Sequence, residues 1–89
     1  MAEVKIAFVG AIIEEPEKAQ QEFNSVVSSY KAIVKCRSGM PFIDEGIAVI
    51  SIVVMGDVDT INAFTGRLGQ IKNVQVKSAV SKKILDAAH

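Results

Sequence analysis

The strongest constraint on the fold is an apolar segment, Gly46 to Met55, with the sequence GIAVISIVVM. In an extended chain, alternate side chains point to opposite faces, and here both faces are apolar apart from Ser51. The segment is rich in β-branched residues, has about the length of a strand, and is bounded by Gly46 and Gly56, which favours a strand over a helix. It therefore predicts a strand in the middle of a sheet, with a covering layer on each side.

Three further segments have the alternation of strands. Residues 4–13 again have two apolar faces and predict a second central strand, in which Gly10 indicates a bulge or a close approach by a neighbour. Residues 31–38 and 73–80 each have one polar and one apolar face, which is typical of strands at sheet edges. Cys36 falls on the apolar face of residues 31–38, so we interpret it as a small core residue.

Two segments have the periodicity of amphipathic helices. The first begins at Glu14-Glu15-Pro16-Glu17, because proline suits the first helical position and glutamates suit the positive end of the helix dipole. Its apolar stripe consists of Ala19, Phe23, Val26, Val27 and Tyr30. The second is capped by Asp57 or Asp59. Its apolar stripe consists of Ile61, Phe64, Leu68 and Ile71.

Glycines mark several special positions. Within the second helix, we expect Gly66 to make a close packing contact and Gly69 to form a left-handed cap just past the last helical residue. Residues 39–46, GMPFIDEG, have turn residues at both ends and predict a connection long enough for a functional loop. Its apolar residues either tuck back into the domain or meet a neighbouring subunit; they are Met40, Phe42 and Ile43.

The order of these elements, βαββαβ, predicts the fold. Double-faced first and third strands with alternating second and fourth strands fit an α+β, ferredoxin-like sandwich, with antiparallel sheet order 4-1-3-2 and two helices on one face. Residues 1–81 would form one domain, and residues 82–89 a tail with at most a frayed helical turn. The chain has nothing left to cover the other face of the sheet, so we expect a second copy to cover it in a dimer or tetramer.

Composition excludes several classes of protein. The chain has 89 residues, of which 49% are hydrophobic and 22% charged, as expected for one folded domain. Ten basic and ten acidic residues balance, which argues against a protein that grips nucleic-acid phosphates. A single cysteine excludes an internal disulfide framework and fits a reducing cytoplasm. The apolar N-terminal run is too short to span a bilayer and lacks the basic cluster of a signal peptide, so we expect no membrane partner.

The sequence contains little catalytic chemistry. It has no P-loop, G-x-G-x-x-G, C-x-x-C or H-E-x-x-H motif, and no nucleophile–base pair beyond generic serines or lysines with carboxylates. Cys36 and His89 are too few to hold a metal ion, so we expect no metal, no cofactor and no enzyme activity. The start of the first helix suits anionic ligand groups, but the glutamates at residues 14, 15 and 17 would repel them.

The run RSGMPFIDEGIAVISIVV, followed by DTINAFTGRLGQIKNVQVK, resembles the small proteins proposed as iron-only hydrogenase system regulators. The resemblance spans residues 5–81, and its most specific pieces are Arg37, Gly39, Pro41, Gly46 and Thr65-Gly66-Arg67-Leu68-Gly69. These proteins are similar to ACT domains and to the C-terminal, metal-sensing domain of the nickel-responsive repressor. The resemblance implies a ferredoxin-like fold, oligomers, and a regulatory role beside hydrogenase maturation genes that is itself inferred for the family.

Two departures from the nickel-responsive repressor affect function. That repressor has an N-terminal ribbon-helix-helix segment that binds DNA, whereas this sequence starts directly at the first strand. Its metal site uses several histidines and a cysteine, which this sequence does not supply. We therefore expect neither direct nickel sensing nor autonomous operator binding.

The leading hypothesis is a non-catalytic, ACT-like oligomeric module that senses a small ligand or a partner protein at subunit boundaries. Arg37 and Arg67 are the first candidates for a ligand or intersubunit contact, because packing and capping do not explain their charge. The other candidates are Gly39, Met40, Pro41 and Phe42, and the expected structural glycines are Gly10, Gly46, Gly66 and Gly69.

Two alternatives stay open. One is a DNA-associated transcription factor that acts through a surface clustered on assembly, with Lys72, Lys77, Lys82 and Lys83. The other is a small enzyme of the dimeric-barrel kind, which would need a deep pocket with a buried acid or histidine.

Overall fold

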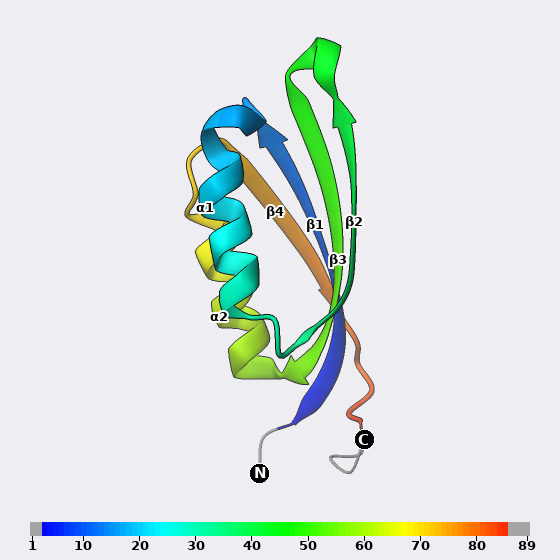
Figure 1. Ribbon diagram of the computed structural model, residues 1–89. Coiled ribbons are helices and arrows are strands. Elements are labelled where there is room, and N and C mark those ends of the chain that lie inside the picture. The colour runs from blue at the N-terminus through cyan, green and yellow to red at the C-terminus, as the bar shows by residue number, and fades with distance from the viewer. Residues whose placement is uncertain (1–2, 86–89) are drawn as a thin grey trace.

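A computed structural model of the protein describes residues 3–85 and contains one antiparallel sheet packed against two helices (Figure 1). In chain order, the elements are β1 (Val4–Glu14), α1 (Pro16–Ser29), β2 (Val34–Phe42), the 3-10 turn η1 (Ile43–Glu45), β3 (Ile47–Asp57), α2 (Val58–Gly69) and β4 (Val74–Val80). The strands are ordered β2-β3-β1-β4, which is the expected order 4-1-3-2 counted from the other edge. The predicted ferredoxin-like fold is confirmed.

The two central strands, β1 and β3, determine where the core lies. They pair over their full lengths, from Val4 opposite Asp57 to Glu14 opposite Ile47. Alternate side chains of both strands are buried beneath α1 and α2, which lie on one side of the sheet (Figure 1). The helices contribute most of their predicted stripes, but Tyr30 and Ile71 follow the last residues of α1 and α2, and Tyr30 is only partly buried. The buried core comprises Ala7, Val9, Ala11, Ile13, Ala19, Phe23, Val26, Val27, Ile50, Ile52, Val54, Ile61, Phe64, Leu68, Ile71 and Val74.

Local chemistry defines the start of each helix. Pro16 occupies the first turn of α1, and the preceding Glu15 has a left-handed backbone with φ of 51°. At the start of α2, Asp57 accepts the backbone N–H of Thr60 at 2.8 Å on one carboxylate oxygen and the Thr60 hydroxyl at 2.8 Å on the other. Asp57, rather than Asp59, is therefore the cap, and the Thr60 N–H is the main reason that the pKa of Asp57 is lowered.

The predicted loop at residues 39–46 is largely a strand. β2 continues through Phe42 and pairs with β3 from Val34 to Phe42, so the connection is reduced to η1 and Gly46. Pro41 has no backbone N–H to donate to a neighbouring strand, but β2 lies at the sheet edge, where a missing N–H can be tolerated. Two turn residues, Pro41 and Gly39, thus indicated a loop where edge position permits a strand.

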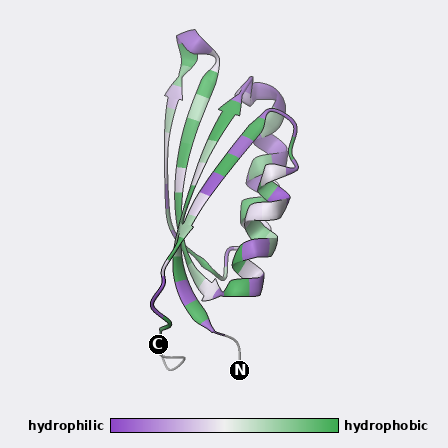
Figure 2. Ribbon diagram, turned by 180° about the vertical axis from the view of Figure 1, so that it is seen from behind, coloured by the Kyte–Doolittle hydropathy of each residue, from purple (hydrophilic) through white to green (hydrophobic). Residues whose placement is uncertain are grey.

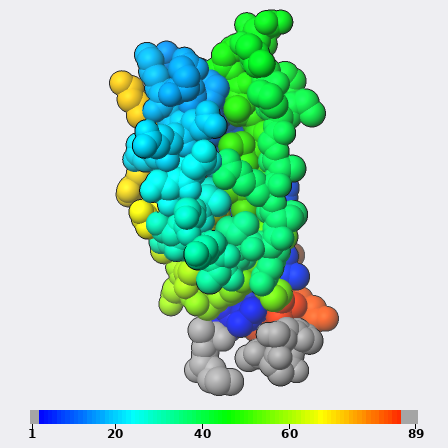
Figure 3. All heavy atoms as spheres, viewed as in Figure 1, coloured from blue at the N-terminus to red at the C-terminus, as the bar shows by residue number. Residues whose placement is uncertain are grey.

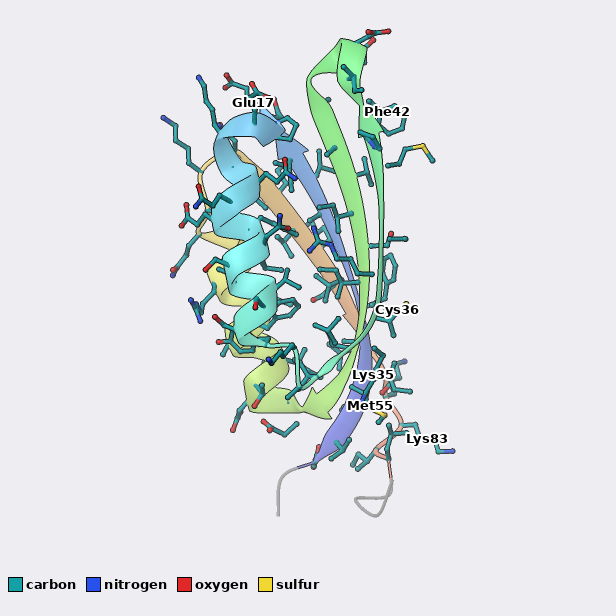
Figure 4. All side chains as sticks on the ribbon, in the orientation of Figure 1. Glu17, Lys35, Cys36, Phe42, Met55 and Lys83 are labelled. Atoms are coloured by element: carbon teal, nitrogen blue, oxygen red, sulfur yellow. The ribbon has the colours of Figure 1, made fainter. Side chains whose placement is uncertain are left out.

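A β-bulge in β2 overturns the interpretation of Cys36 as a core residue. Val34 pairs with Val54 and Cys36 pairs with Val53, so Lys35 is an extra residue on the β2 side. The bulge reverses the alternation for the rest of the strand. Cys36 consequently points away from the helices and is exposed (Figure 4).

The glycines differ in what they do. A Cβ on Gly66 would meet no atom within 4 Å, so no close packing contact exists there, and Gly69 is the last helical residue with no left-handed backbone. Gly10 pairs with both neighbouring strands without a bulge, and a Cβ there would meet Phe8 at an ordinary 3.5 Å. Gly46 is left-handed, with φ of 66°.

The sequence indicated Gly56 only as the end of the apolar segment and not as a packing position. A Cβ there would lie 2.7 Å from Cγ2 of Ile33, a contact too short for any side chain to be accommodated without movement. Ile33 is held in place because its carbonyl accepts the backbone N–H of Met55 at 2.8 Å. Gly56 therefore allows the chain before β2 to close over the end of β3.

After β4 the chain runs beside β1. The N–H of Ser81 donates to the carbonyl of Ile6 at 2.8 Å, and the N–H of Leu85 donates to the carbonyl of Val4 at 2.7 Å. Residues 81–85 contain no helical turn, and residues 86–89, with His89, lie outside the described residues. Among the described helices, none combines the length and the apolar character needed to cross a membrane.

Candidate functional site

The side of the sheet opposite the helices is the first candidate surface, and we call it the open sheet face. Its residues alternate with the core residues along each strand. They are Ile6, Phe8, Gly10 and Ile12 of β1, Cys36, Ser38, Met40 and Phe42 of β2, Val49, Ser51, Val53 and Met55 of β3, and Gln75, Lys77 and Ala79 of β4. Cys36, Phe42 and Met55 can be seen on this side in Figure 4.

The open sheet face is mostly apolar. Phe8 is 50% exposed and Ile12 is 42% exposed, although each is surrounded by paired strands. A shallow hollow of about 420 Å³ lies over the centre of the face, between Phe8, Ile12 and Val49. Figure 2 shows hydrophobic residues through the strands, whereas hydrophilic residues gather at the tip of the β2–β3 hairpin and at the start of α1.

The second candidate is a groove on the helix side, between α1 and the β2–β3 hairpin, which we call the α1–β2 groove. Figure 3 shows a furrow between the atoms of α1 and those of the hairpin. The groove has a volume of about 210 Å³. Its lining combines apolar and polar groups: Ile13, Pro16, Gln20, Phe23, Asn24, Arg37, Gly39, Met40, Pro41, Ala48 and Ile50.

Arg37 is the charged residue of the α1–β2 groove. Its Nη2 donates to Oδ1 of Asn24 at 2.7 Å, and its guanidinium lies 5.6 Å from the centre of the Phe23 ring. Both partners are on α1, so the helix holds the arginine side chain across the groove. Within residues 3–85, no carboxylate forms an ion pair with Arg37. Its charge and most of its N–H donors are thus available to a ligand.

The structure separates the two arginines that the sequence paired as candidates. Arg67, on α2, has its guanidinium 5.5 Å from the centre of the Tyr30 ring. The Tyr30 ring in turn packs against that of Phe64, with the two ring centres 5.2 Å apart. Arg67 is not among the residues that line the open hollow or the α1–β2 groove. Arg67 therefore covers the aromatic pair of Tyr30 and Phe64 at one end of the core.

The candidates on β2 are divided between the two faces of the sheet. Arg37 and Gly39 pair with Ile52 and Ile50, which are core residues, so they face the groove, and Pro41 follows in the same phase. Met40 and Phe42 alternate with them and belong to the open sheet face, although Met40 also borders the groove. A contiguous sequence cluster therefore supplies both candidate surfaces.

The α1 residues of the groove could not be predicted from the sequence. Gln20 and Asn24 lie outside the apolar stripe predicted for the first helix, and Phe23 was assigned only to that stripe. Nothing in the sequence links Asn24 to Arg37, because a hydrogen bond between a helix and the following strand depends on how they pack. The spacing of Gln20 and Asn24, one helical turn apart beside Phe23, is the only local signal.

The acidic start of α1 forms a separate feature. Glu15 pairs with Lys18 at 3.0 Å on the surface, and the hydrogen bond from Lys18 to Glu15 is the main reason that the pKa of Lys18 is raised. Exposed pairs of this kind contribute little stability. The described residues contain no cluster of three or more metal-ligating side chains.

Comparison with known proteins gives one family match. Residues 5–78 match the TM1266-like family model, described as "Iron-only hydrogenase system regulator, putative". The structure of uncharacterized protein TM1266 from Thermotoga maritima is 34% identical, with a TM-score of 0.85, and the match covers 90% of this chain and 100% of that one. No match was found among curated proteins.

More distant solved structures share the fold alone. An unknown protein from Galdieria sulphuraria has a TM-score of 0.61 at 11% identity, over 93% of this chain and 48% of that one. SnoaB, a cofactor-independent oxygenase from Streptomyces nogalater, has a TM-score of 0.50 at 10% identity, over the whole of both chains. At such identities the oxygenase carries no information on the activity of this chain.

Proposed function

Since the chain belongs to the TM1266-like family of iron-only hydrogenase system regulators, we propose that it is a non-catalytic regulatory module that self-associates through the open sheet face. In this proposal, the assembled protein senses a small ligand or a partner protein near the subunit boundary. The family supports the regulatory role, and the open sheet face supports the self-association.

The apolar character of the open sheet face is the observation that carries the proposal. The central strands have 11 residues each, so at about 3.3 Å per residue the face is about 36 Å long. With four strands about 4.8 Å apart, its area is several hundred Å², near the limit for apolar patches on monomers. One partner in a standard interface buries about 800 Å². A second copy packed sheet against sheet is of the size to cover it.

The alternation of β2 supports a link between ligand and assembly. Arg37 and Gly39 face the α1–β2 groove, while Met40 and Phe42 face the open side, on the same short strand. A molecule bound in the groove would restrain β2 from one side, and a second copy would contact it from the other. Differential binding of this kind is what a ligand needs in order to shift an assembly equilibrium.

Substitution of Ile12 by glutamate tests the proposed assembly. Ile12 lies on the central strand β1 between Val49 and Gln75, so Ile12→Glu places a charge in the middle of the open sheet face. We expect the wild-type protein to sediment as a dimer or tetramer and Ile12→Glu to raise the dissociation constant at least 100-fold, because an unpaired charge would be buried. Analytical ultracentrifugation over a range of concentrations measures this change.

Ile43→Glu is the matched control. Ile43 is 84% exposed, but it lies in η1 at the hairpin tip and outside the open sheet face, so this variant should assemble as the wild type does. Circular dichroism checks that both variants are folded. A folded wild-type protein that stays monomeric at the highest concentration, or equal losses in the two variants, would refute the proposal.

Neither alternative function gains a specific observation. The lysines considered for DNA binding are dispersed: Lys77 is on the open sheet face, Lys72 is in the turn before β4, and Lys82 and Lys83 follow β4. Lys72 also shares a hollow with Glu15 and Glu22, whose charges oppose a phosphate. For an enzyme, the described residues contain no buried polar or charged side chain.

A further inference from the structure

The α1–β2 groove has the composition of a small ligand site. Its floor is apolar, with Ile13, Ala48 and Ile50 from the sheet, and Gly39 leaves the adjoining position without a side chain. Its rim carries two amides and one guanidinium, from Gln20, Asn24 and Arg37. An apolar surface with a few convergent polar groups is typical of small-molecule sites, and about 210 Å³ is below the range of about 300–1,000 Å³ that drug-sized ligands occupy.

The charge in the groove selects the polar end of the ligand. Arg37 is held in place by Asn24 and by the ring of Phe23, and it has no acidic partner within the described part of the chain. A guanidinium matches a carboxylate in a bidentate geometry, and this pairing is stronger than a hydrogen bond between neutral groups. The groove is therefore complementary to an anionic group next to an apolar body.

The same lining discriminates against amino acids. None of the described residues that line the groove is acidic, so an α-ammonium group would lose water without gaining a counter-charge. The apolar floor suits a neutral group in its place. This distinction separates an apolar monocarboxylate from the zwitterion with the same side chain.

We propose that the α1–β2 groove binds a small apolar monocarboxylate, with its carboxylate on Arg37 and its hydrocarbon part on Ile13, Ala48 and Ile50. This inference rests on the proposed function only for its regulatory meaning, because the groove is built by residues of a single chain. Binding can therefore be measured whether or not the protein assembles.

The probe is 4-methylpentanoate, titrated into ¹⁵N-labelled protein and followed by the amide chemical shifts. We expect saturable shifts at Gln20, Asn24 and Gly39 and at their neighbours. The neutral 4-methylpentanamide and the zwitterion L-leucine have similar apolar bodies, and we expect both to bind at least tenfold more weakly. Equal binding of the amide would overturn the role of charge, and equal binding of leucine would overturn the exclusion of amino acids.

A charge-removing variant with a matched control locates the site. Arg37→Gln removes the charge, and we expect affinity for 4-methylpentanoate to fall at least tenfold. Arg67→Gln makes the same change at the other arginine, which lies over the ring of Tyr30 outside the groove, and should bind as the wild type does. Similar losses in both variants, or shifts centred on the open sheet face, would overturn the assignment.

Gly39→Val tests the groove itself. A Cβ on Gly39 would meet Ile50 at 3.7 Å and the carbonyl of Val49 at 3.8 Å, both ordinary contacts, so valine can be built into β2 while its methyl groups occupy the groove. We expect this variant to remain folded and to lose saturable binding with Arg37 intact. Unchanged binding would mean that the probe contacts only the exposed guanidinium, which would overturn the site.

One further measurement separates this inference from the proposed function. In the Ile12→Glu variant, the groove residues are unchanged, and we expect 4-methylpentanoate to bind to the dissociated chain. Binding of the probe to a chain that does not assemble would support the ligand site even if the proposed self-association is wrong. Assembly without binding of the probe at millimolar concentration would refute the ligand site and leave the proposed self-association unaffected.

Discussion

The two faces of the sheet are built from the same strands and the same kinds of residue, yet they end in opposite environments. On the covered face, Val9, Ile52 and Val54 are completely buried beneath the helices. On the open sheet face, Phe8 and Ile12 alternate with them and remain exposed in the single chain. The difference teaches that an apolar strand face is a surface that must be buried, whereas the layer that buries it comes from elsewhere, either from the rest of the chain or from a second copy.

A pair of phenylalanine truncations gives the largest expected contrast between the faces. Phe64→Ala removes a completely buried ring of α2 from the core over the covered face and should lower the free energy of unfolding by about 3–5 kcal/mol. Phe8→Ala removes a half-exposed ring from the open sheet face and should cost the single chain less than about 1.5 kcal/mol. Urea denaturation at low protein concentration measures both changes.

The same pair of variants also tests whether a second copy covers the open sheet face. If a second copy covers the open sheet face, the cost of Phe8→Ala must grow as protein concentration rises, because stability is then linked to assembly. The cost of Phe64→Ala should not change in this way. If the loss of unfolding free energy in Phe8→Ala does not depend on protein concentration, the open sheet face is exposed to water and no second copy covers it.

A pair of glycine substitutions gives the second contrast. Gly56→Ala puts a Cβ 2.7 Å from Cγ2 of Ile33 on the covered side and should cost about 1–3 kcal/mol of stability. Gly10→Ala puts a Cβ on the open side, 3.5 Å from the ring of Phe8, and should change stability by less than about 1 kcal/mol. Thermal unfolding measures both, and an equal loss in the two variants would contradict the difference in packing.

The smallest expected effect concerns the edge of the covering layer. The pKa of Asp57 is lowered, chiefly because its carboxylate accepts the N–H of Thr60 at the start of α2. A lowered folded-state pKa means that the capping contribution is present above the unfolded pKa, about 3.9, and is lost as the pH falls through the folded value. Asp57→Asn keeps a capping group without the titration.

Acid unfolding of this pair tests the cap. The wild type should lose a few degrees more of Tm than Asp57→Asn between pH 6 and pH 3, because only its cap is protonated. If the protein self-associates through the open sheet face, as proposed, the change in pH should affect that association equally in the two proteins. A wild type and variant with identical dependence of Tm on pH would exclude the cap as a titrating contribution.

Much of the fold could be predicted because its signals are local and periodic. The double-faced runs in β1 and β3 indicated the central strands, and the stripes of α1 and α2 indicated the helix face. The errors in β2 concern spacing that tertiary contacts decide. The bulge at Lys35 moved Cys36 to the other face, and pairing at the sheet edge converted the expected loop around Pro41 into strand.

The candidate site was predicted less completely for the same reason. Arg37 and Gly39 were identified, but their partners on α1 were not, and Arg67 was grouped with them although it lies over Tyr30. Gly56 was missed because its role depends on Ile33, which approaches it only in the folded chain. A residue's chemistry is visible in the sequence, whereas its neighbours across the fold are not.

By itself, the sequence determined the order of elements, the two central strands and the apolar excess of the sheet, because side-chain alternation and helical periodicity are properties of neighbouring residues. The tertiary structure alone decided which face each β2 residue occupies and which groups surround Arg37. Those outcomes depend on register and on the packing of α1 against the hairpin, where one extra residue reverses every side chain that follows.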